Sequence, residues 1–165
     1  MVGVMKAKRN RHCKGSRANR GSPSKSIISP ILIRETFANT WLKDGEPRNR
    51  TQTAYSLLLY FNILVDEHER KKAADALREI IAKNEYLVGT GFAGTWTLDH
   101  SLRKVGATED FYKMLLQTRV PSWLYQVVQG ATTTWERWDS LLPDGSVNGC
   151  GMTSFNHYAF GSVAD

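Results

Sequence analysis

Residues 51–83 read TQTAYSLLLYFNILVDEHERKKAADALREIIAK, and this stretch decides the fold class. Its first part, Thr51–Leu64, is apolar around most of its circumference, which predicts a helix that is buried on several sides. Its second part, Glu67–Lys83, predicts an amphipathic helix capped by Asp66, because its apolar residues recur at the spacing of one helix face. An inner buried helix followed by an outer amphipathic one is the repeating unit of an α/α barrel, although a helical bundle or solenoid has the same periodicity.

The same alternation continues toward the C-terminus. The apolar spacing predicts a helix over Thr95–Val105, ended by Gly106, and another over Glu109–Thr118, capped by Thr108. About five or six helices fit between residue 37 and the C-terminus, too few for the closed double ring of about twelve in an α/α barrel. The sequence therefore predicts an all-α fold that is either a smaller bundle or a part of a barrel.

Positive charge is concentrated at the N-terminus. Residues 1–34 contain nine of the 22 Lys and Arg residues and no acidic one, whereas residues 35–165 contain the other 13 and all 16 acidic residues. The predicted domain, 35–165, therefore has a net charge of −3, although the whole chain has +6. Residues 1–34 form a predicted basic tail, disordered up to about residue 30 because it offers little apolar surface to bury. Residues 1–30 contain no Phe, Tyr or Trp to stack on bases, so no nucleic-acid partner is predicted.

Several other classes of function are not expected. Cys13 and Cys150 form no C-x-x-C pair and have no cluster of histidines nearby, so neither a metal site nor a cofactor is predicted. The longest apolar run, Ser56–Val65, is interrupted by Asn62 and is much shorter than the ~20 residues of a membrane-spanning helix, so no membrane partner is predicted. The basic N-terminus is not followed by the apolar stretch of a signal peptide, and the compartment stays open.

The densest candidate chemistry lies around Glu136, which stands between Trp135 and Trp138 in the sequence ATTTWERWD, residues 131–139. A carboxylate flanked by tryptophans would be partly desolvated and therefore usable as a base or acid near neutral pH, and tryptophan faces stack on sugar rings. The alternative is ordinary: Glu136 and Arg137 could form a surface ion pair, with both tryptophans on one buried helical face. Spacing alone favours neither interpretation.

A second cluster, SFNHY at residues 154–158, follows a loop rich in turn residues. Ser154 or Asn156 could cap a final helix, from whose first turn His157 would project. A neutral histidine at that point could exchange hydrogen bonds with sugar hydroxyls, although an isolated histidine is more often structural. Taken by itself, this cluster predicts a structural role for His157.

Five segments occur together in one order: TQTAYSLLLYFNIL, GTGFAGT, PSWLYQVVQGATTTWERWD, LLPDG and MTSFNHYAFGSVAD. Through them the chain resembles the C-terminal half of the catalytic six-hairpin domain of α-L-rhamnosidases, glycoside hydrolase family 78. The resemblance implies a partial (α/α)6 barrel and hydrolysis of terminal α-L-rhamnose from glycosides, with inversion at the anomeric carbon. It also implies that Glu136 is the general base, that His157 contacts the sugar, and that Trp135 and Trp138 help to shape the substrate pocket.

The resemblance also implies a missing part. Inverting hydrolysis needs a second carboxyl group, the general acid, and in this family it belongs to a block upstream of the matched segments. The chain is therefore expected to be a fragment that binds a rhamnose-containing glycoside and is inactive alone. Apolar helix surfaces that the rest of a barrel would cover are expected to drive self-association. The alternative from another class is a non-catalytic carbohydrate-binding helical module.

Overall fold

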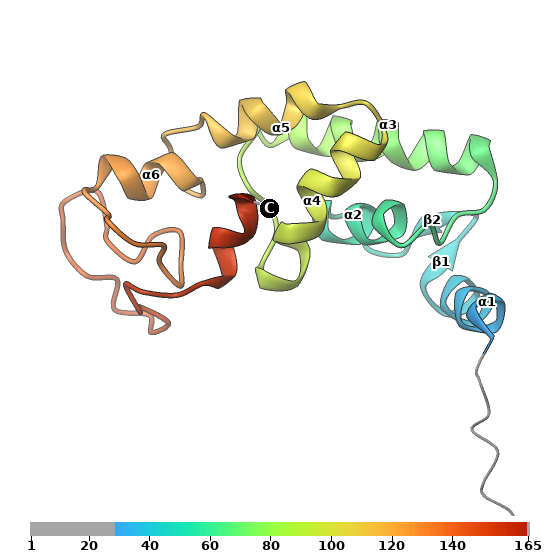
Figure 1. The fold of residues 1–165 in the computed structure, drawn as a ribbon, viewed down its shortest axis with the longest axis horizontal. Helices are drawn as coiled ribbons and strands as arrows, with labels where there is room; N and C mark the ends of the chain where they lie inside the picture. The colour runs from blue at the N-terminus through green and yellow to red at the C-terminus, as the bar shows by residue number, and fades with distance from the viewer. Residues whose placement is uncertain (1–28, 165) are drawn as a thin grey trace, which may run out of the picture.

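The computed structural model describes residues 29–164, and helices dominate this range (Figure 1). The elements are, in order, α1 (Pro30–Trp41), β1 (Leu42–Lys43), β2 (Glu46–Pro47), α2 (Gln52–Tyr60), α3 (Glu67–Lys83), α4 (Phe92–Lys104), α5 (Thr108–Leu115), α6 (Trp123–Val128) and the 3-10 helix η1 (Ala159–Ala164). The strands β1 and β2 pair antiparallel, with Leu42 opposite Pro47 and Lys43 opposite Glu46. Two residues are too few to produce an alternating pattern, so the sequence alone does not reveal these strands.

Helices α2 and α4 lie against each other at the centre of the helical part. The hydroxyl oxygens of Ser56 on α2 and Thr97 on α4 lie 3.1 Å apart in a buried hydrogen bond, and the Ser101 hydroxyl donates to the Ser56 carbonyl at 2.7 Å. A methyl group in place of the Gly94 hydrogen would lie 2.7 Å from the Thr53 hydroxyl, so only glycine permits this close approach. In the view of Figure 1, α3 and α5 run along the edge above this pair, which gives the predicted alternation of inner and outer helices.

Local capping signals set several helix ends. The Asp66 carboxylate accepts from the Glu69 N–H at 3.0 Å and confirms the predicted N-cap of α3. Gly106 follows α4 with a φ of 72°, the left-handed conformation predicted for it. Helix α2 ends at Tyr60, earlier than predicted, because Asn62 also takes a left-handed conformation, with a φ of 50°.

Two other predicted helix boundaries are wrong. Helix α4 begins at Phe92 rather than at Thr95. Helix α5 has Ala107 as its N-cap, includes Thr108 as its first residue and ends at Leu115. No helix within residues 29–164 is both long and apolar enough to cross a bilayer.

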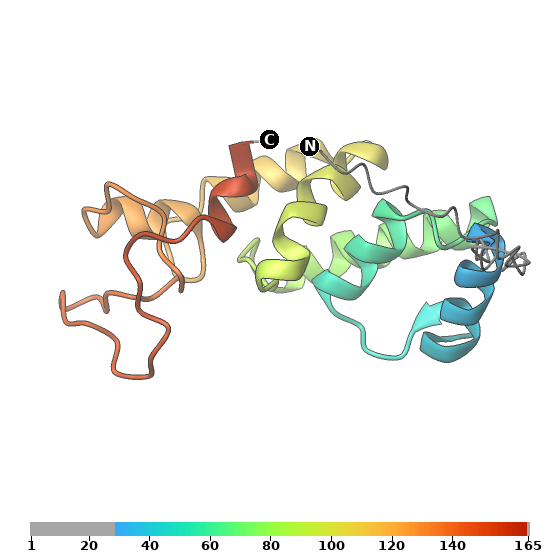
Figure 2. The same cartoon turned by 60° about the horizontal axis from the view of Figure 1, so that its bottom comes forward.

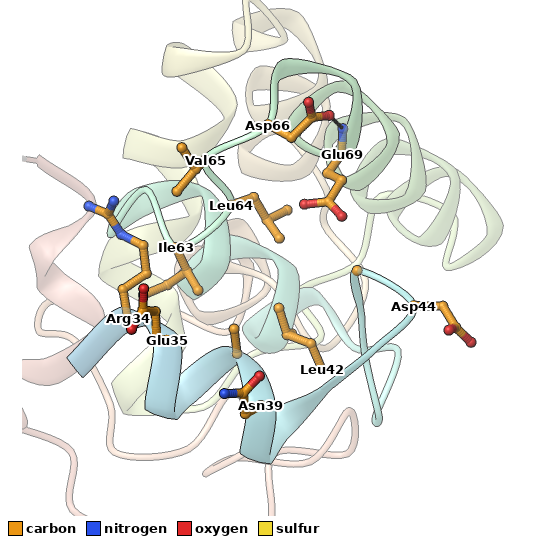
Figure 3. A pocket seen from close by; sticks show the side chains of 12 residues that line it. Arg34, Glu35, Asn39, Leu42, Asp44, Ile63, Leu64, Val65, Asp66 and Glu69 are labelled. Carbon is orange, nitrogen blue, oxygen red and sulfur yellow. Dashed lines mark hydrogen bonds between the residues drawn. The ribbon is translucent and has the colours of Figure 1, made fainter. Parts of the chain in front are cut away.

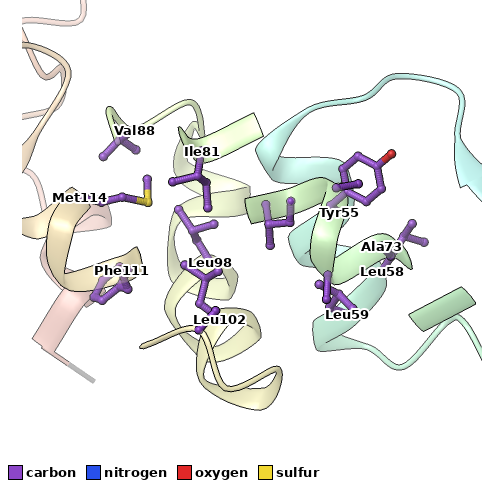
Figure 4. Close-up of a cluster of buried hydrophobic side chains, with 14 of the residues drawn as sticks. Tyr55, Leu58, Leu59, Ala73, Ile81, Val88, Leu98, Leu102, Phe111 and Met114 are labelled. Atoms are coloured by element: carbon purple, nitrogen blue, oxygen red, sulfur yellow. The ribbon is translucent and has the colours of Figure 1, made fainter. Parts of the chain in front are cut away.

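The buried core joins α2, α3, α4 and α5 (Figure 4). Tyr55, Leu77 and Leu98 are fully buried in it, each with 0% of its surface exposed. Trp138 and Phe160 belong to the same cluster, so the core reaches into the C-terminal part of the chain, where the candidate motifs lie. The position of those motifs therefore depends on the same packing that holds the helices together.

The boundary predicted after residue 34 falls inside helix α1. The Ser29 hydroxyl accepts from the Ile31 N–H and caps the helix. Pro30 is the first residue of the helix, where a backbone N–H would have no partner within the helix, so the lack of an N–H in proline costs no hydrogen bond. Residues 30–34, assigned above to the tail, are therefore helical. Residues 1–28, which include most of the predicted tail, lie outside the described range.

Helix α1 exposes an apolar surface, and the prediction of self-association rests on this surface. A groove of about 390 Å³ runs along it, lined by Leu32, Ile33, Thr36, Phe37, Thr40 and Trp41. Ile33 is 55% exposed and Trp41 is 57% exposed. We expect the chain to form dimers or larger species at micromolar concentration, because association would remove this surface from water.

Ile33→Glu is expected to shift the chain toward monomer in sedimentation velocity, because a charge on the groove opposes its burial. Val127→Glu on α6 is the matched control, since Val127 is similarly exposed, at 60%, but lies outside the groove. A wild-type chain that stays monomeric at high concentration would contradict the prediction.

Candidate functional site

The two C-terminal motifs come together by backbone pairing. The Glu136 N–H donates to the Ser154 carbonyl at 2.9 Å, and the His157 N–H donates to the Thr134 carbonyl at 2.8 Å. The Thr133 hydroxyl donates to the backbone carbonyl of Phe155 in the same pairing. Segments separated by about twenty residues of sequence therefore lie side by side, and the first of them is irregular rather than helical. The alternative that places both tryptophans on one helical face is wrong for this reason.

A buried glutamine on α6 supports the backbone on both sides of Glu136. Gln126 is only 4% exposed. Its side-chain oxygen accepts from the Trp135 N–H at 3.1 Å, and its amide nitrogen approaches the Arg137 carbonyl at 3.5 Å. The Ser140 hydroxyl donates to the same carbonyl at 3.2 Å. These contacts satisfy backbone groups that the irregular segment would otherwise leave without partners.

Glu136 lines a pocket of about 310 Å³ between this segment and the start of α4. The lining residues are Thr90, Gly91, Phe92, Glu136, Arg137, Trp138, Asp139, Met152 and Phe160. Glu136 is half-buried, and its Oε2 accepts from the Ser154 N–H at 3.2 Å. Within residues 29–164, Glu136 forms no ion pair. The pocket therefore offers a carboxylate that no neighbouring cation neutralises.

The two predicted tryptophans occupy different places. Trp138 lines the pocket and stacks on Phe160, with 3.9 Å between ring centroids and 21° between ring planes. Trp123 meets Trp138 edge-on at 5.0 Å and donates from its indole N–H to the Phe160 carbonyl. Trp135 is 2% exposed and is not part of the pocket wall. Trp138 is thus largely buried, with 9% of its surface exposed, and contributes only a small part of the pocket wall, whereas Trp135 lies away from that wall.

His157 lies next to the pocket rather than on its wall. Its ring stacks on Phe92, which does line the pocket, with 4.9 Å between centroids and 19° between planes. Its Nδ1 accepts from the Ala159 N–H at 3.3 Å, so a neutral ring carries its proton on Nε2. His157 precedes η1 and caps it, which corrects the expectation that it projects from the first turn of a final helix.

Arg137 and Asp139 form an ion pair in the pocket that the motifs did not reveal. The Arg137 Nε lies 2.9 Å from one Asp139 carboxylate oxygen, and Nη2 lies 3.2 Å from the other. This hydrogen bonding to Asp139 raises the pKa of Arg137 above its ordinary value. The expected alternative, an ion pair between Glu136 and Arg137, is therefore wrong. The signal that could have found the pair is the second acidic residue, two positions after Arg137.

A larger pocket, of about 510 Å³, lies between α1 and the connection from α2 to α3 (Figure 3). Arg34 and Glu35 reach it from α1, and Asp66 and Glu69 from the start of α3. Asp66 already caps α3, and this pocket contains none of the predicted site residues. Across residues 29–164, no cluster of three His, Cys, Asp or Glu side chains is arranged to hold a metal ion.

Comparison with known proteins assigns the chain to a family. Residues 31–165 match the bacterial alpha-L-rhamnosidase 6 hairpin glycosidase domain. The chain is 44% identical over 134 residues to an α-L-rhamnosidase of Streptomyces avermitilis, a match that covers 81% of this chain and 13% of that protein. It is 37% identical over 135 residues to an α-L-rhamnosidase of Formosa agariphila, covering 81% of this chain and 14% of that protein.

Comparison with solved structures indicates the same family. The native α-L-rhamnosidase of Aspergillus terreus is similar with a TM-score of 0.79 and 53% identity, over 81% of this chain and 16% of that one. The Streptomyces avermitilis α-L-rhamnosidase, solved in complex with L-rhamnose, is similar with a TM-score of 0.75 and 41% identity, over 81% of this chain and 13% of that one. The chain thus spans about one seventh of the length of these relatives, and its fold is part of a six-hairpin glycosidase domain. Residues 31–165 belong to the α-L-rhamnosidase six-hairpin glycosidase family.

Proposed function

We propose that the pocket around Glu136 is the general-base side of the catalytic site of an inverting α-L-rhamnosidase. The observation that carries this proposal is the state of the Glu136 carboxylate, which is half-buried beside Trp138 and forms no ion pair within the described residues. Such a carboxylate can accept a proton, and an aromatic wall can bind the apolar face of a sugar. The complex of the Streptomyces avermitilis relative with L-rhamnose supports this choice of sugar.

The hydrogen bonding of Glu136 is consistent with a role as general base. The Ser154 N–H holds Oε2 at 3.2 Å, and within the described residues Oε1 has no hydrogen-bond partner. Oε1 is thus available to take a proton from a water molecule that attacks the anomeric carbon. The C–O bond to the leaving group breaks as the new bond forms on the opposite face of the ring, which inverts the configuration.

The second carboxyl group of the reaction has to come from elsewhere. An inverting enzyme separates its acid and base by ~6.5–9.5 Å, and the acid must carry a proton when the bond breaks. Among the described residues, Asp139 is the only other carboxylate on the wall of this pocket, and both of its oxygens already accept hydrogen bonds from Arg137. The role of the general acid is therefore not assigned to Asp139, and residues 29–164 are expected to bind the sugar without efficient turnover.

Trp138 and His157 are assigned to sugar binding in this proposal, and Trp135 to support of the segment. The exposed part of Trp138 borders the pocket, and the Nε2–H of His157 would donate to a sugar hydroxyl beside it. A purely sugar-binding helical module would use the same contacts. The two functions differ in Glu136, which binding alone does not require.

Binding of L-rhamnose to the wild-type chain tests the proposal. We expect saturable quenching or enhancement of tryptophan fluorescence, because the sugar would cover the pocket face of Trp138. Trp138→Phe should remove most of this response, whereas Trp96→Phe should retain it, since Trp96 lies on α4 outside the pocket. D-glucose is the control sugar. An equal response to both sugars, or a response that depends on Trp96, would contradict the assignment.

A further inference from the structure

The two carboxylates of the pocket differ in their partners. Asp139 accepts three hydrogen bonds: from Arg137 Nε at 2.9 Å, from Arg137 Nη2 at 3.2 Å and from the Asn148 side-chain amide at 2.9 Å. Glu136 accepts one, from the Ser154 N–H. Arg137 carries the positive charge nearest to Glu136 in the sequence. It pairs with Asp139 rather than with Glu136.

The ion pair between Arg137 and Asp139 is partly buried and has a two-point geometry. Their side chains are 27% and 32% exposed, and the guanidinium approaches both carboxylate oxygens in the two-point geometry that arginine favours. The Nη1 of Arg137 also approaches the Gly151 carbonyl at 3.4 Å. Asn148 is 8% exposed, and its side-chain amide donates to the same Asp139 oxygen as Arg137 Nη2. The guanidinium is thus held by groups on two parts of the loop.

A guanidinium released from Asp139 would have another carboxylate within the same pocket. Arg137 follows Glu136 directly in the chain, and both side chains line the pocket. An arginine that pairs with a carboxylate favours its ionised form, which makes the carboxylate a weaker proton acceptor. A change of partner by Arg137, from Asp139 to Glu136, would therefore make Glu136 a weaker base.

We propose that Asp139 is a positioning residue that holds Arg137 away from Glu136 and so keeps the Glu136 carboxylate free to accept a proton. The inference rests on the proposed role of Glu136 as the general base. Asp139 itself does not touch the reacting atoms in this account. Asp139 acts on Glu136 through Arg137. A second substitution at Arg137 can therefore distinguish this role from a general effect of Asp139 on folding.

Among the described residues, Arg137 is the cationic side chain on the wall of the pocket that contains Glu136. On the α4 side, the pocket wall consists of the uncharged residues Thr90, Gly91 and Phe92. The loop and η1 contribute Met152 and Phe160, which are also uncharged. Two further titratable side chains lie near this cluster: His157 on the paired segment, and Cys150, whose thiol interacts with Arg137.

The Ser154 amide proton provides a direct measurement of the Glu136 carboxylate, because it donates to Oε2. In a pH titration followed by two-dimensional NMR of the full chain, its chemical shift should change as Glu136 gains a proton. Glu136→Gln should abolish this change, which assigns it to Glu136 rather than to His157. No sugar and no catalytic activity are needed for this readout.

Asp139→Asn is expected to move the Ser154 response to lower pH by about one to three units, because the released guanidinium would pair with Glu136. The asparagine oxygen still accepts from Asn148, so the loop should stay folded. Arg137→Met combined with Asp139→Asn should return the response to the wild-type pH. Loss of structure alone would not be repaired by a second substitution.

Asp110→Asn is the matched control, because Asp110 also pairs with an arginine, Arg78, at 2.6 Å, but on α5 and outside the pocket. It should leave the Ser154 response unchanged. The inference is overturned if Ser154 does not respond to pH in the wild type, if Asp139→Asn leaves the response in place, or if the double variant fails to restore it. Failure of the chain to bind L-rhamnose would instead refute the proposed function and leave this result standing.

Discussion

Glu136→Gln is expected to lower kcat for a chromogenic α-L-rhamnoside by about 10²–10⁴-fold, the usual contribution of a general base. The assay needs a site with both carboxyl groups. A chimera supplies it, in which residues 31–165 replace the corresponding segment of the Streptomyces avermitilis α-L-rhamnosidase. Glutamine keeps the shape of the side chain and its contact with the Ser154 N–H, but it cannot take a proton from water. KM should therefore change much less than kcat.

Glu79→Gln in the same chimera is the control, because Glu79 lies on the outer face of α3 and pairs with Lys83. It should leave kcat unchanged. Turnover by Glu136→Gln within a few-fold of the unmodified chimera would remove the general base from this account. Loss of binding together with loss of turnover would assign Glu136 to sugar binding instead.

Leu98→Ala is expected to reduce the free energy of unfolding by about 2–5 kcal/mol, because it opens a cavity at a fully buried position. Leu98 lies on α4 in the cluster that joins α2, α3, α4 and α5 (Figure 4). It lies on the same helix whose first residue, Phe92, lines the pocket. The loss of packing should therefore weaken the rhamnose response as well as the stability.

Leu116→Ala is the matched substitution at an exposed position, since 67% of Leu116 is accessible to solvent. It should change the free energy of unfolding by no more than about 0.5 kcal/mol in urea denaturation. Equal losses for the two variants would mean that the cluster around Leu98 is not the core of the folded chain.

Local chemistry accounts for the parts of the fold that the sequence predicts well. Asp66 and Gly106 mark helix ends through interactions within a few residues, and both are confirmed. The apolar spacing on either side of Asp66 predicts an inner and an outer helix, and α2 and α3 are these helices. The family resemblance predicts the six-hairpin domain, which the comparisons confirm.

Contacts between distant residues account for what the sequence does not predict. The segment around Glu136 is irregular because its backbone pairs with Ser154 and His157, and helical periodicity carries no information about such a partner. The pairing also decides that Trp138 faces the pocket and that Trp135 does not, although their spacing suits one helix face. The roles of Glu136, His157 and both tryptophans remain predictions.

The most direct test of the central claim is a crystal structure of the chain with bound L-rhamnose. The account predicts that the sugar lies in the pocket between Glu136 and the start of α4, with its apolar face against Trp138. A Glu136 carboxylate oxygen should lie within hydrogen-bond distance of a water molecule or hydroxyl at the anomeric carbon. L-rhamnose bound in the larger pocket of Figure 3, or bound with its anomeric carbon turned away from Glu136, would contradict the account.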